Sequence, residues 1–126
     1  MLDLDNFKDI NDHFGHGAGD EVLVETAQLL KNTFKEDVVA RFGGDEFIIF
    51  VQDISHRELS SRCQDLLVRV GEIPCMKGRD IHLTLSIGVV FVSTEKDMSE
   101  LLEKADEALY KVKRNKRNNY CIYEAK

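Results

Sequence analysis

The sequence predicts a single mixed α/β domain, in which helices pack on one β-sheet in the order β-α-α-β-β-α-β-α-β. Four segments carry apolar residues at helical spacing, and the shorter runs between them are rich in β-branched and aromatic residues, as strands are. The chain has 126 residues, of which 43% are hydrophobic and 32% are charged, and this composition suits one globular core. No internal repeat or low-complexity tract divides it.

The first third of the chain predicts one strand and two helices. Residues Met1–Asp5 are apolar and then abruptly acidic, as at the end of a strand. A short helix is expected over Asn6–Phe14, and Gly15 and Gly17 are expected to break it before a second helix over about Ala18–Lys35. The buried stripe of the second helix is expected to consist of Leu23, Ala27, Leu30 and Phe34.

The middle of the chain predicts a β-hairpin and a helix. Val38–Ala40 and Phe47–Val51 are strand-like, and the pair Gly43 and Gly44 between them permits the positive φ angles of a tight turn. An amphipathic helix is expected over Ser55–Val70, with its first serine as the N-cap.

The last third predicts a strand, a helix and a closing strand. Ile81–Val92 alternates in the manner of a strand, Ser99 to about Asn115 has helical spacing, and Tyr120–Tyr123 is a short strand. We expect the first strand of the chain to lie at the centre of the sheet.

Charge and composition exclude several classes of function. The formal net charge is −6, which disfavours nonspecific nucleic-acid binding. No apolar run is long enough to cross a bilayer and no signal-peptide pattern is present, so we expect no membrane contact by this domain, although a longer parent protein could be membrane-anchored. Cys63, Cys75 and Cys121 form no CxxC pair and are expected to be reduced thiols, which indicates a cytoplasmic protein.

Two acids at strand ends raise the first chemical hypothesis. Asp3 stands where the first strand ends and Asp45 stands at the hairpin tip, so pairing of these strands would bring both carboxylates together. Two carboxylates and a backbone carbonyl make an incomplete cage for Mg²⁺, which phosphate oxygens and water would complete. Ordinary roles remain open, with Asp3 and Asp5 as strand-end turn residues and Asp45 as a solvated loop acid.

A basic cluster near the C-terminus is the second candidate feature. Its side chains could meet the phosphates of such a ligand. They could equally be cations at a helix C-terminus, where the helix dipole favours them. The cluster consists of Lys111, Lys113, Arg114, Lys116 and Arg117.

Four stretches of the chain follow one another as recognisable motifs: DLDNFKDINDHFGHGAGDEVL, VARFGGDEF, LSIGVV and ADEALYKVKRNKRN. In order and spacing they resemble the GGDEF family of diguanylate cyclases, over essentially the whole chain. The resemblance implies the palm-like, ferredoxin-like mixed sheet of nucleotide cyclases and polymerases. It also implies a reaction, in which two GTP molecules condense to cyclic di-GMP and two pyrophosphates. A homodimer is implied, because each protomer holds one GTP and the two half-sites face each other.

The resemblance implies a metal centre that uses Mg²⁺ or Mn²⁺. Asp3 matches the metal-binding aspartate, and Leu4 matches the residue whose backbone carbonyl also touches metal. Asp45 matches the second carboxylate ligand and the base toward the ribose 3′-hydroxyl. Glu46 lies beside it, where it would help to hold a second metal and take part in catalysis.

Further positions match substrate contacts of the family. Gly43 and Gly44 match a close approach to the nucleotide. Asn11 and Asp20 match residues that read guanine, and a carboxylate at position 20 suits the N1–H and N2–H donors that guanine presents and adenine lacks. The remaining matches are His16 for substrate, Lys8, Lys113 and Arg117 for phosphate, and the backbone near Phe7 beside the same phosphates. Lys8 is counted with Asp45 and Glu46 as catalytic.

The chain departs from the family pattern in two places. The family's domain normally begins upstream with a turn and a helix, whereas only Met1 and Leu2 precede Asp3 here, so we expect residues 1–126 to be an N-terminally truncated GGDEF domain of a longer parent chain with sensory or regulatory domains. Lys116 replaces the glycine usual before the matched arginine, which could change how Arg117 is presented. A GTP-binding module that regulates a partner without turnover is the alternative function.

Overall fold

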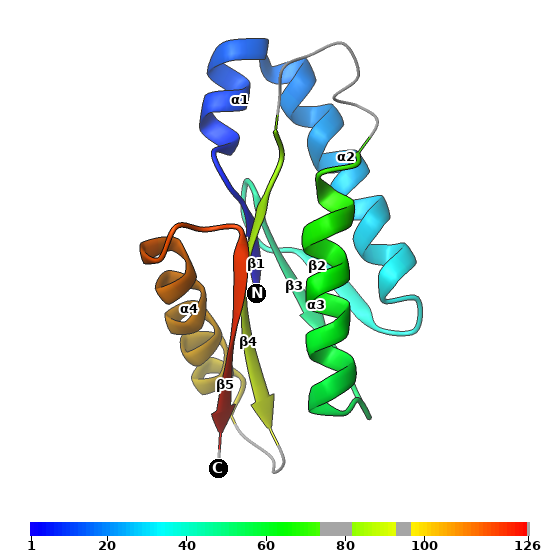
Figure 1. Cartoon of the computed structure of the whole chain (residues 1–126), viewed down its shortest axis with the longest axis vertical. Coiled ribbons are helices and arrows are strands. Elements are labelled where there is room, and N and C mark those ends of the chain that lie inside the picture. Colours follow the sequence, from blue (N-terminus) through cyan, green and yellow to red (C-terminus); the bar gives the residue numbers. More distant parts are fainter. Residues whose placement is uncertain (74–81, 93–96, 126) are drawn as a thin grey trace.

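The computed structural model describes residues 1–73, 82–92 and 97–125, and within them it contains the predicted elements in the predicted order (Figure 1). The predicted mixed sheet with flanking helices is therefore confirmed. The elements are β1 (Leu2–Leu4), α1 (Phe7–Phe14), α2 (His16–Thr33), β2 (Val38–Arg41), β3 (Glu46–Phe50), α3 (His56–Val70), β4 (Leu85–Val92), α4 (Met98–Arg114) and β5 (Asn119–Ala125).

The sheet has the strand order β2-β3-β1-β4-β5, so β1 lies at its centre, as predicted. β1 runs antiparallel to both β3 and β4, and β4 runs parallel to β5. The helices α2 and α3 lie on one side of the sheet and α4 lies on the other (Figure 1). The order of the elements follows from their apolar patterns. The three-residue strand β1 lies at the centre of the sheet because it pairs with β3 on one side and with β4 on the other.

The short strand β1 serves both faces of the sheet. Successive side chains on a strand point to opposite faces. Leu2 and Leu4, each 2% exposed, join the apolar core with residues of α2 and α3, whereas Asp3 contacts Lys113 of α4. Alternation within β1 therefore anchors the strand in the core and turns one carboxylate toward α4.

The boundary between α1 and α2 differs from the prediction. Gly15 does interrupt the chain, with φ +87, but Gly17 lies inside the first turn of α2, which begins at His16. The helix ends at Thr33 because Phe34 turns out of the helical conformation and is buried in the core. The predicted burial of Phe34 is confirmed, and the predicted break at Gly17 is wrong.

The hairpin loop is built differently from the predicted tight turn. β2 ends at Arg41 and β3 begins at Glu46, so residues 42–45 form the connection, and neither Gly43 nor Gly44 has a positive φ. The side chain of Arg41 donates to the carbonyl oxygens of Gly43 and Gly44 at 3.0 and 2.7 Å. The loop is therefore held by a side chain, and both glycines lie outside the left-handed conformation.

The later elements agree closely with the prediction. Ser55 caps α3 by accepting a hydrogen bond from the backbone N–H of Glu58 at 3.1 Å. β4 begins at Leu85, later than predicted, and Ile81 lies outside the described residues. β5 is longer than predicted because it pairs with β4 along its whole length. Cys63 and Cys121 are free, and Cys75 lies outside the described residues.

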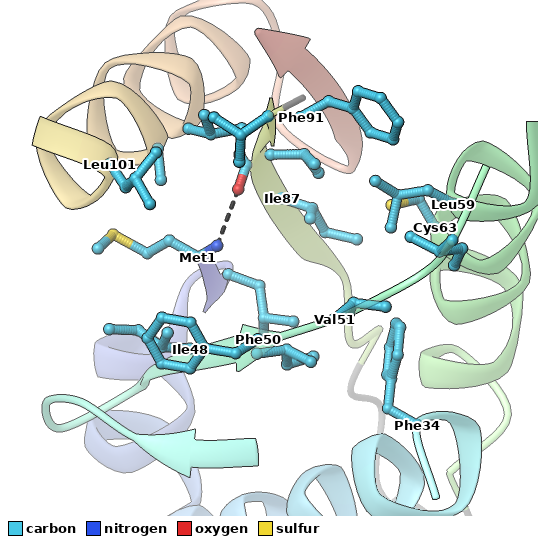
Figure 2. A pocket seen from close by; sticks show the side chains of 18 of the residues that line it. Met1, Phe34, Ile48, Phe50, Val51, Leu59, Cys63, Ile87, Phe91 and Leu101 are labelled. Carbon is cyan, nitrogen blue, oxygen red and sulfur yellow. Dashed lines mark hydrogen bonds between the residues drawn. The ribbon is translucent and has the colours of Figure 1, made fainter. Parts of the chain in front are cut away.

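An apolar cavity of about 500 Å³ lies beyond the start of β1, between β3, β4, α3 and α4 (Figure 2). Met1 joins the β4 ladder here, since Gly88 donates its N–H to the Met1 carbonyl and accepts from the Met1 amino group, both at 2.8 Å. The cavity has an apolar wall and contains none of the candidate site residues, so it does not suit a triphosphate. No helix within the described residues is long and apolar enough to span a membrane.

Candidate functional site

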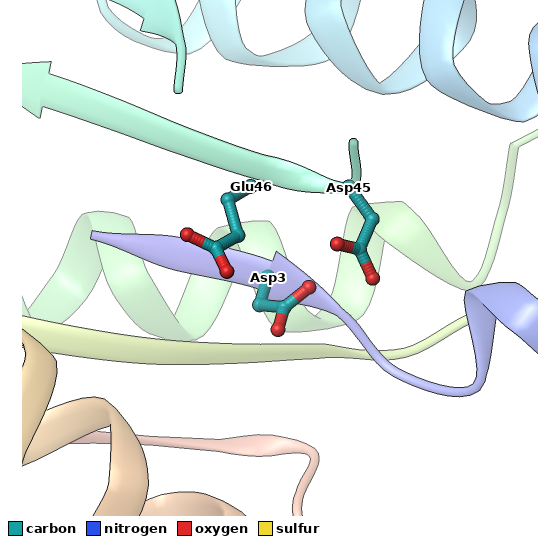
Figure 3. Close-up of side chains that lie close together, drawn as sticks. All are labelled: Asp3, Asp45 and Glu46. Atoms are coloured by element: carbon teal, nitrogen blue, oxygen red, sulfur yellow. The ribbon is translucent and has the colours of Figure 1, made fainter. Parts of the chain in front are cut away.

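Three carboxylates meet where β1 and β3 run side by side. Asp3, Asp45 and Glu46 each offer an oxygen, and these oxygens lie within 4.8 Å of one another. Asp3 is the register partner of Glu46, and the backbone N–H of Leu4 donates to the Asp45 carbonyl at 3.2 Å. Figure 3 shows the side chains of all three acids turned toward a common point. The predicted convergence of Asp3 and Asp45 is therefore present, and Glu46 joins them.

Asp3 is the most constrained of these acids. Its residue is 5% exposed, its Oδ2 accepts from the Lys113 ammonium, and no donor among the described residues reaches its Oδ1. Burial raises the pKa of the Asp3 carboxyl to about 6, with Lys113 opposing the rise and the neighbouring Asp45 adding to it. A buried oxygen without a donor, beside two further carboxylates, is the donor set that a hard divalent cation requires. The residues present therefore fit such an ion.

Replacing Asp3 with asparagine is expected to stabilise the metal-free domain at neutral pH. Because the folded-state pKa of Asp3 is raised, its ionisation costs stability as pH rises from about 4 to about 6, and asparagine removes this cost of about 1–2 kcal/mol. Thermal unfolding of both proteins in the presence of a chelator, at pH 4 and at pH 7.5, measures this difference in stability. The stability gap between variant and original should widen at the higher pH.

Added Mg²⁺ provides the control for this variant. The ion should raise the melting temperature of the original domain at pH 7.5 and leave that of Asp3→Asn unchanged, because the variant lacks the buried anion. Equal Mg²⁺ stabilisation of both proteins would contradict the assignment of Asp3 as a ligand.

Lys113 brings α4 to the carboxylates. It is the residue of the basic cluster that contacts Asp3, across the face of the sheet that α4 covers. A cavity of about 280 Å³ opens beside this ion pair. It is lined by Glu46, Asp106, Glu107, Leu109, Tyr110 and Lys113. Lys113 thus holds its ammonium group against Asp3, beside this open space.

The chain leaves α4 through a left-handed stretch that carries Arg117. Lys116 has φ 77, and the backbone N–H of Arg117 donates to the Val112 carbonyl at 3.0 Å. This is the longer of the two hydrogen bonds of a Schellman motif, in which glycine usually takes the left-handed position. Lys116 therefore adopts the glycine conformation despite its side chain, and the helix ends where a glycine would end it.

Replacing Lys116 with glycine is expected to stabilise the domain by about 1 kcal/mol, because glycine pays no steric cost at positive φ. Urea unfolding monitored by circular dichroism measures the change. Lys111→Gly, the same substitution inside α4, should instead destabilise by about 1 kcal/mol. A destabilising effect at both positions would show that Lys116 is not strained.

The proposed guanine-reading residues lie on α1 and α2, which pack against each other. Asn11 of α1 lies against the backbone of Gly19: a Cβ added to Gly19 would meet the Asn11 Oδ1 at 1.8 Å. Asp20 follows Gly19 and is exposed, as is His16 in the first turn of the same helix. Asn11 thus lies at the contact between the two helices, and Asp20 is the next residue along α2 after that contact.

The remaining predicted residues surround the start of α1 and the hairpin loop. Phe7 and Lys8 form the first turn of α1, which follows Asn6 in a left-handed conformation with φ 59. The first N–H groups of a helix have no intrahelical partner and favour anions. Gly43 and Gly44 are exposed, and nothing lies within 4 Å of a Cβ added to Gly44, so space is open there.

Sequence reasoning missed the role of Asp5. It was interpreted as a strand-end turn residue, yet it is 3% exposed and accepts three hydrogen bonds, from Thr84 just before β4, from Ser86 in β4 and from Asn118 after α4. The available signal was alternation, because Asp5 stands two positions after Asp3 and therefore faces the same side.

Comparisons with known proteins agree with this geometry. Residues 1–119 match the family model described as "Diguanylate cyclase, GGDEF domain". The chain is 39% identical over 128 residues to diguanylate cyclase DosC of Escherichia coli (strain K12), covering 99% of this chain and 28% of that protein. It is 40% identical over 125 residues to diguanylate cyclase A of Treponema denticola, covering 97% of this chain and 34% of that protein.

A solved structure shares the fold. The active GGEEF domain of a diguanylate cyclase from Vibrio cholerae superimposes with a TM-score of 0.84 at 34% identity, covering 99% of this chain and 81% of that one. The chain spans roughly 28% to 34% of the length of the two curated relatives named above. The family match over nearly the whole chain is decisive for its classification: this chain belongs to the GGDEF family of diguanylate cyclases.

Proposed function

We propose that this domain condenses two GTP molecules into cyclic di-GMP and two pyrophosphates. The observation that carries the proposal is the three-carboxylate cluster, in which a buried Asp3 oxygen has no donor among the described residues. Hydroxyl attack on a nucleoside triphosphate needs such a cluster, because the attacking oxygen must lose a proton and the phosphates must be neutralised. Mg²⁺, or Mn²⁺ in its place, is the proposed cofactor.

Asp3, Asp45 and Glu46, with the backbone carbonyl of Leu4, are the proposed metal ligands. A divalent cation bound there would lower the pKa of the ribose 3′-hydroxyl and offset phosphate charge. Asp45 accepts the hydroxyl proton. The 3′-oxygen then forms a bond to the α-phosphorus of the other GTP, the bond between the α- and β-phosphates breaks, and pyrophosphate leaves with the electron pair.

Cationic side chains are proposed to hold the triphosphate. Lys113 pairs with Asp3 in the metal-free structure, so a cation at the carboxylates would release its ammonium toward the phosphates. Arg117 and Lys8 are proposed to contact the same phosphates, and the first turn of α1 at Phe7 would offer backbone N–H groups. These groups offset the charge that builds up as the α-phosphorus is attacked.

Guanine recognition is proposed to rest on Asn11 and Asp20. A carboxylate accepts from both N1–H and N2–H of guanine, and a site built for these donors rejects a base that lacks them. His16 is proposed to lie beside the bound nucleotide, at the start of the same helix as Asp20. Gly43 and Gly44 are proposed to let the triphosphate approach the hairpin loop, and nothing lies within 4 Å of a Cβ added to Gly44.

The reaction requires two protomers, because the part of the chain that the structure describes offers one such site and the product contains two nucleotides. We therefore expect the specific activity to rise with protein concentration. The test is incubation with GTP and Mg²⁺ over a wide dilution series, with chromatographic detection of cyclic di-GMP. Asp3→Asn is the negative control.

Two outcomes would count against the proposal. Specific activity that stays constant far below the dimer dissociation constant would contradict a shared site. GTP binding without any product, at every concentration, would instead indicate a regulatory module that does not turn over. We also propose that the parent protein carries sensory or regulatory domains and that this domain works in the cytoplasm, where its substrate is made.

A further inference from the structure

Asp5 ties together three parts of the chain that are far apart in sequence. Its residue is 3% exposed. Its Oδ1 accepts from the Ser86 hydroxyl at 2.7 Å, and its Oδ2 accepts from the Thr84 hydroxyl at 2.6 Å and from the backbone N–H of Asn118 at 3.1 Å. The end of β1 is thereby fixed both to β4 and to the loop that follows α4.

The loop after α4 needs such a restraint. Lys116, Arg117 and Asn118 have φ angles of 77, 60 and 47, a run of left-handed residues without any glycine. Each such residue is less favourable than an ordinary conformation and persists only where neighbouring groups hold it. Two hydrogen bonds from backbone N–H groups hold these residues. Arg117 donates to the Val112 carbonyl in α4, and Asn118 donates to the Asp5 carboxylate outside the helix.

We propose that Asp5 is a positioning residue that fixes the backbone beside Arg117, the proposed phosphate ligand. The carboxylate fixes Asn118, the neighbour of Arg117, to the strand that carries Asp3, so the phosphate-binding loop and the metal strand form one unit. The inference rests on the proposed function in one respect, which is that Arg117 contacts phosphate.

The contacts of Asp5 differ from those of a metal ligand. Three donors already occupy its two oxygens, whereas Asp3 has an oxygen without a donor among the described residues. A buried carboxylate whose two oxygens both accept hydrogen bonds is a poorer cation ligand than one with an oxygen that no donor reaches. Asp5 therefore acts through Asn118 and Arg117 rather than on the substrate.

A substitution can remove the charge of Asp5 and keep its hydrogen bonds, because of the kinds of donor that surround it. A hydroxyl can donate or accept, so Ser86 can accept from an amide NH₂, but the backbone N–H of Asn118 can only donate. An asparagine at position 5 can place its oxygen toward Asn118 and its NH₂ toward Ser86. Asp5→Asn thus keeps the contacts and loses the charge, whereas Asp5→Ala loses both.

Hydrogen exchange at the Asn118 amide, measured by NMR without nucleotide, tests the positioning. We expect protection in the original and in Asp5→Asn, and faster exchange in Asp5→Ala. Ser86→Ala removes a single donor and leaves a small buried side chain, so it should fold and give a weaker form of the same effect. Unchanged protection in both alanine variants would overturn the proposal.

Steady-state kinetics with GTP and Mg²⁺ test the consequence. Asp5→Ala should raise the KM for GTP about tenfold, the loss of one charge-assisted phosphate contact, with a smaller change in kcat. Asp5→Asn should restore the KM, whereas Asp3→Asn should remain inactive. An inactive Asp5→Asn would show that the charge is needed and would refute the positioning role.

The exchange experiment and the kinetic experiment together distinguish a failure of this inference from a failure of the proposed function. Exchange at Asn118 does not depend on turnover, so the expected exchange pattern in a protein that makes no cyclic di-GMP would refute only the function. An active original with unchanged exchange in the alanine variants would refute only the role of Asp5.

Discussion

Replacing Asp45 with alanine is expected to abolish cyclic di-GMP synthesis and to leave the fold intact. Loss of a general base alone costs about 10²- to 10⁴-fold, and Asp45 is also a proposed metal ligand. The fold should survive because the tertiary bond at this residue uses its backbone: Leu4 donates to the Asp45 carbonyl, which alanine retains.

The measurement is product formation from GTP at saturating Mg²⁺, together with thermal unfolding of each protein. Asp65→Ala is the matched control, since Asp65 lies on α3, on the other side of the sheet, in an exposed ion pair with Arg69. That variant should keep full activity. Near-normal synthesis by Asp45→Ala would contradict both proposed roles of the residue.

The order of elements could be predicted because each carries its own apolar period. The shape of the hairpin loop could not be predicted, because it depends on hydrogen bonds from the Arg41 side chain to the carbonyls of Gly43 and Gly44. A glycine pair permits a left-handed turn but does not require one. The start of α2 was missed for a related reason, because Gly17 fits a helix whenever neighbouring packing favours it.

The candidate site could be predicted only in part. Asp3 and Asp45 follow from strand ends that pair, and pairing is what hydrophobic patterns specify best. The contacts of Asp5 join residues 79, 81 and 113 positions apart, so no local pattern reveals them. The Lys113 ion pair with Asp3 is equally distant in sequence, and helix packing on the sheet creates it.

Gly19 is where α2 meets the side chain of Asn11, which is one of the two proposed guanine-reading residues. A Cβ at this position would lie 1.8 Å from Oδ1 and 2.8 Å from Cγ of Asn11, so an alanine must displace the Asn11 side chain. That displacement is cheap for the fold, because the end of an asparagine can rotate away. It is costly for recognition if Asn11 contacts guanine where the structure places it.

Gly19→Ala is therefore expected to move stability and binding in opposite directions. Alanine favours a helix over glycine by up to about 1 kcal/mol, so the variant should fold at least as well as the original. Its affinity for GTP, measured by calorimetry, should fall about tenfold or more, as we also expect for Asn11→Ala and Asp20→Ala. Its preference for GTP over ATP should decrease. Gly17→Ala is the control, because nothing lies within 4 Å of a Cβ at Gly17. This control should bind GTP normally. Tight, guanine-selective binding by Gly19→Ala would mean that Asn11 does not read the base from its place against α2.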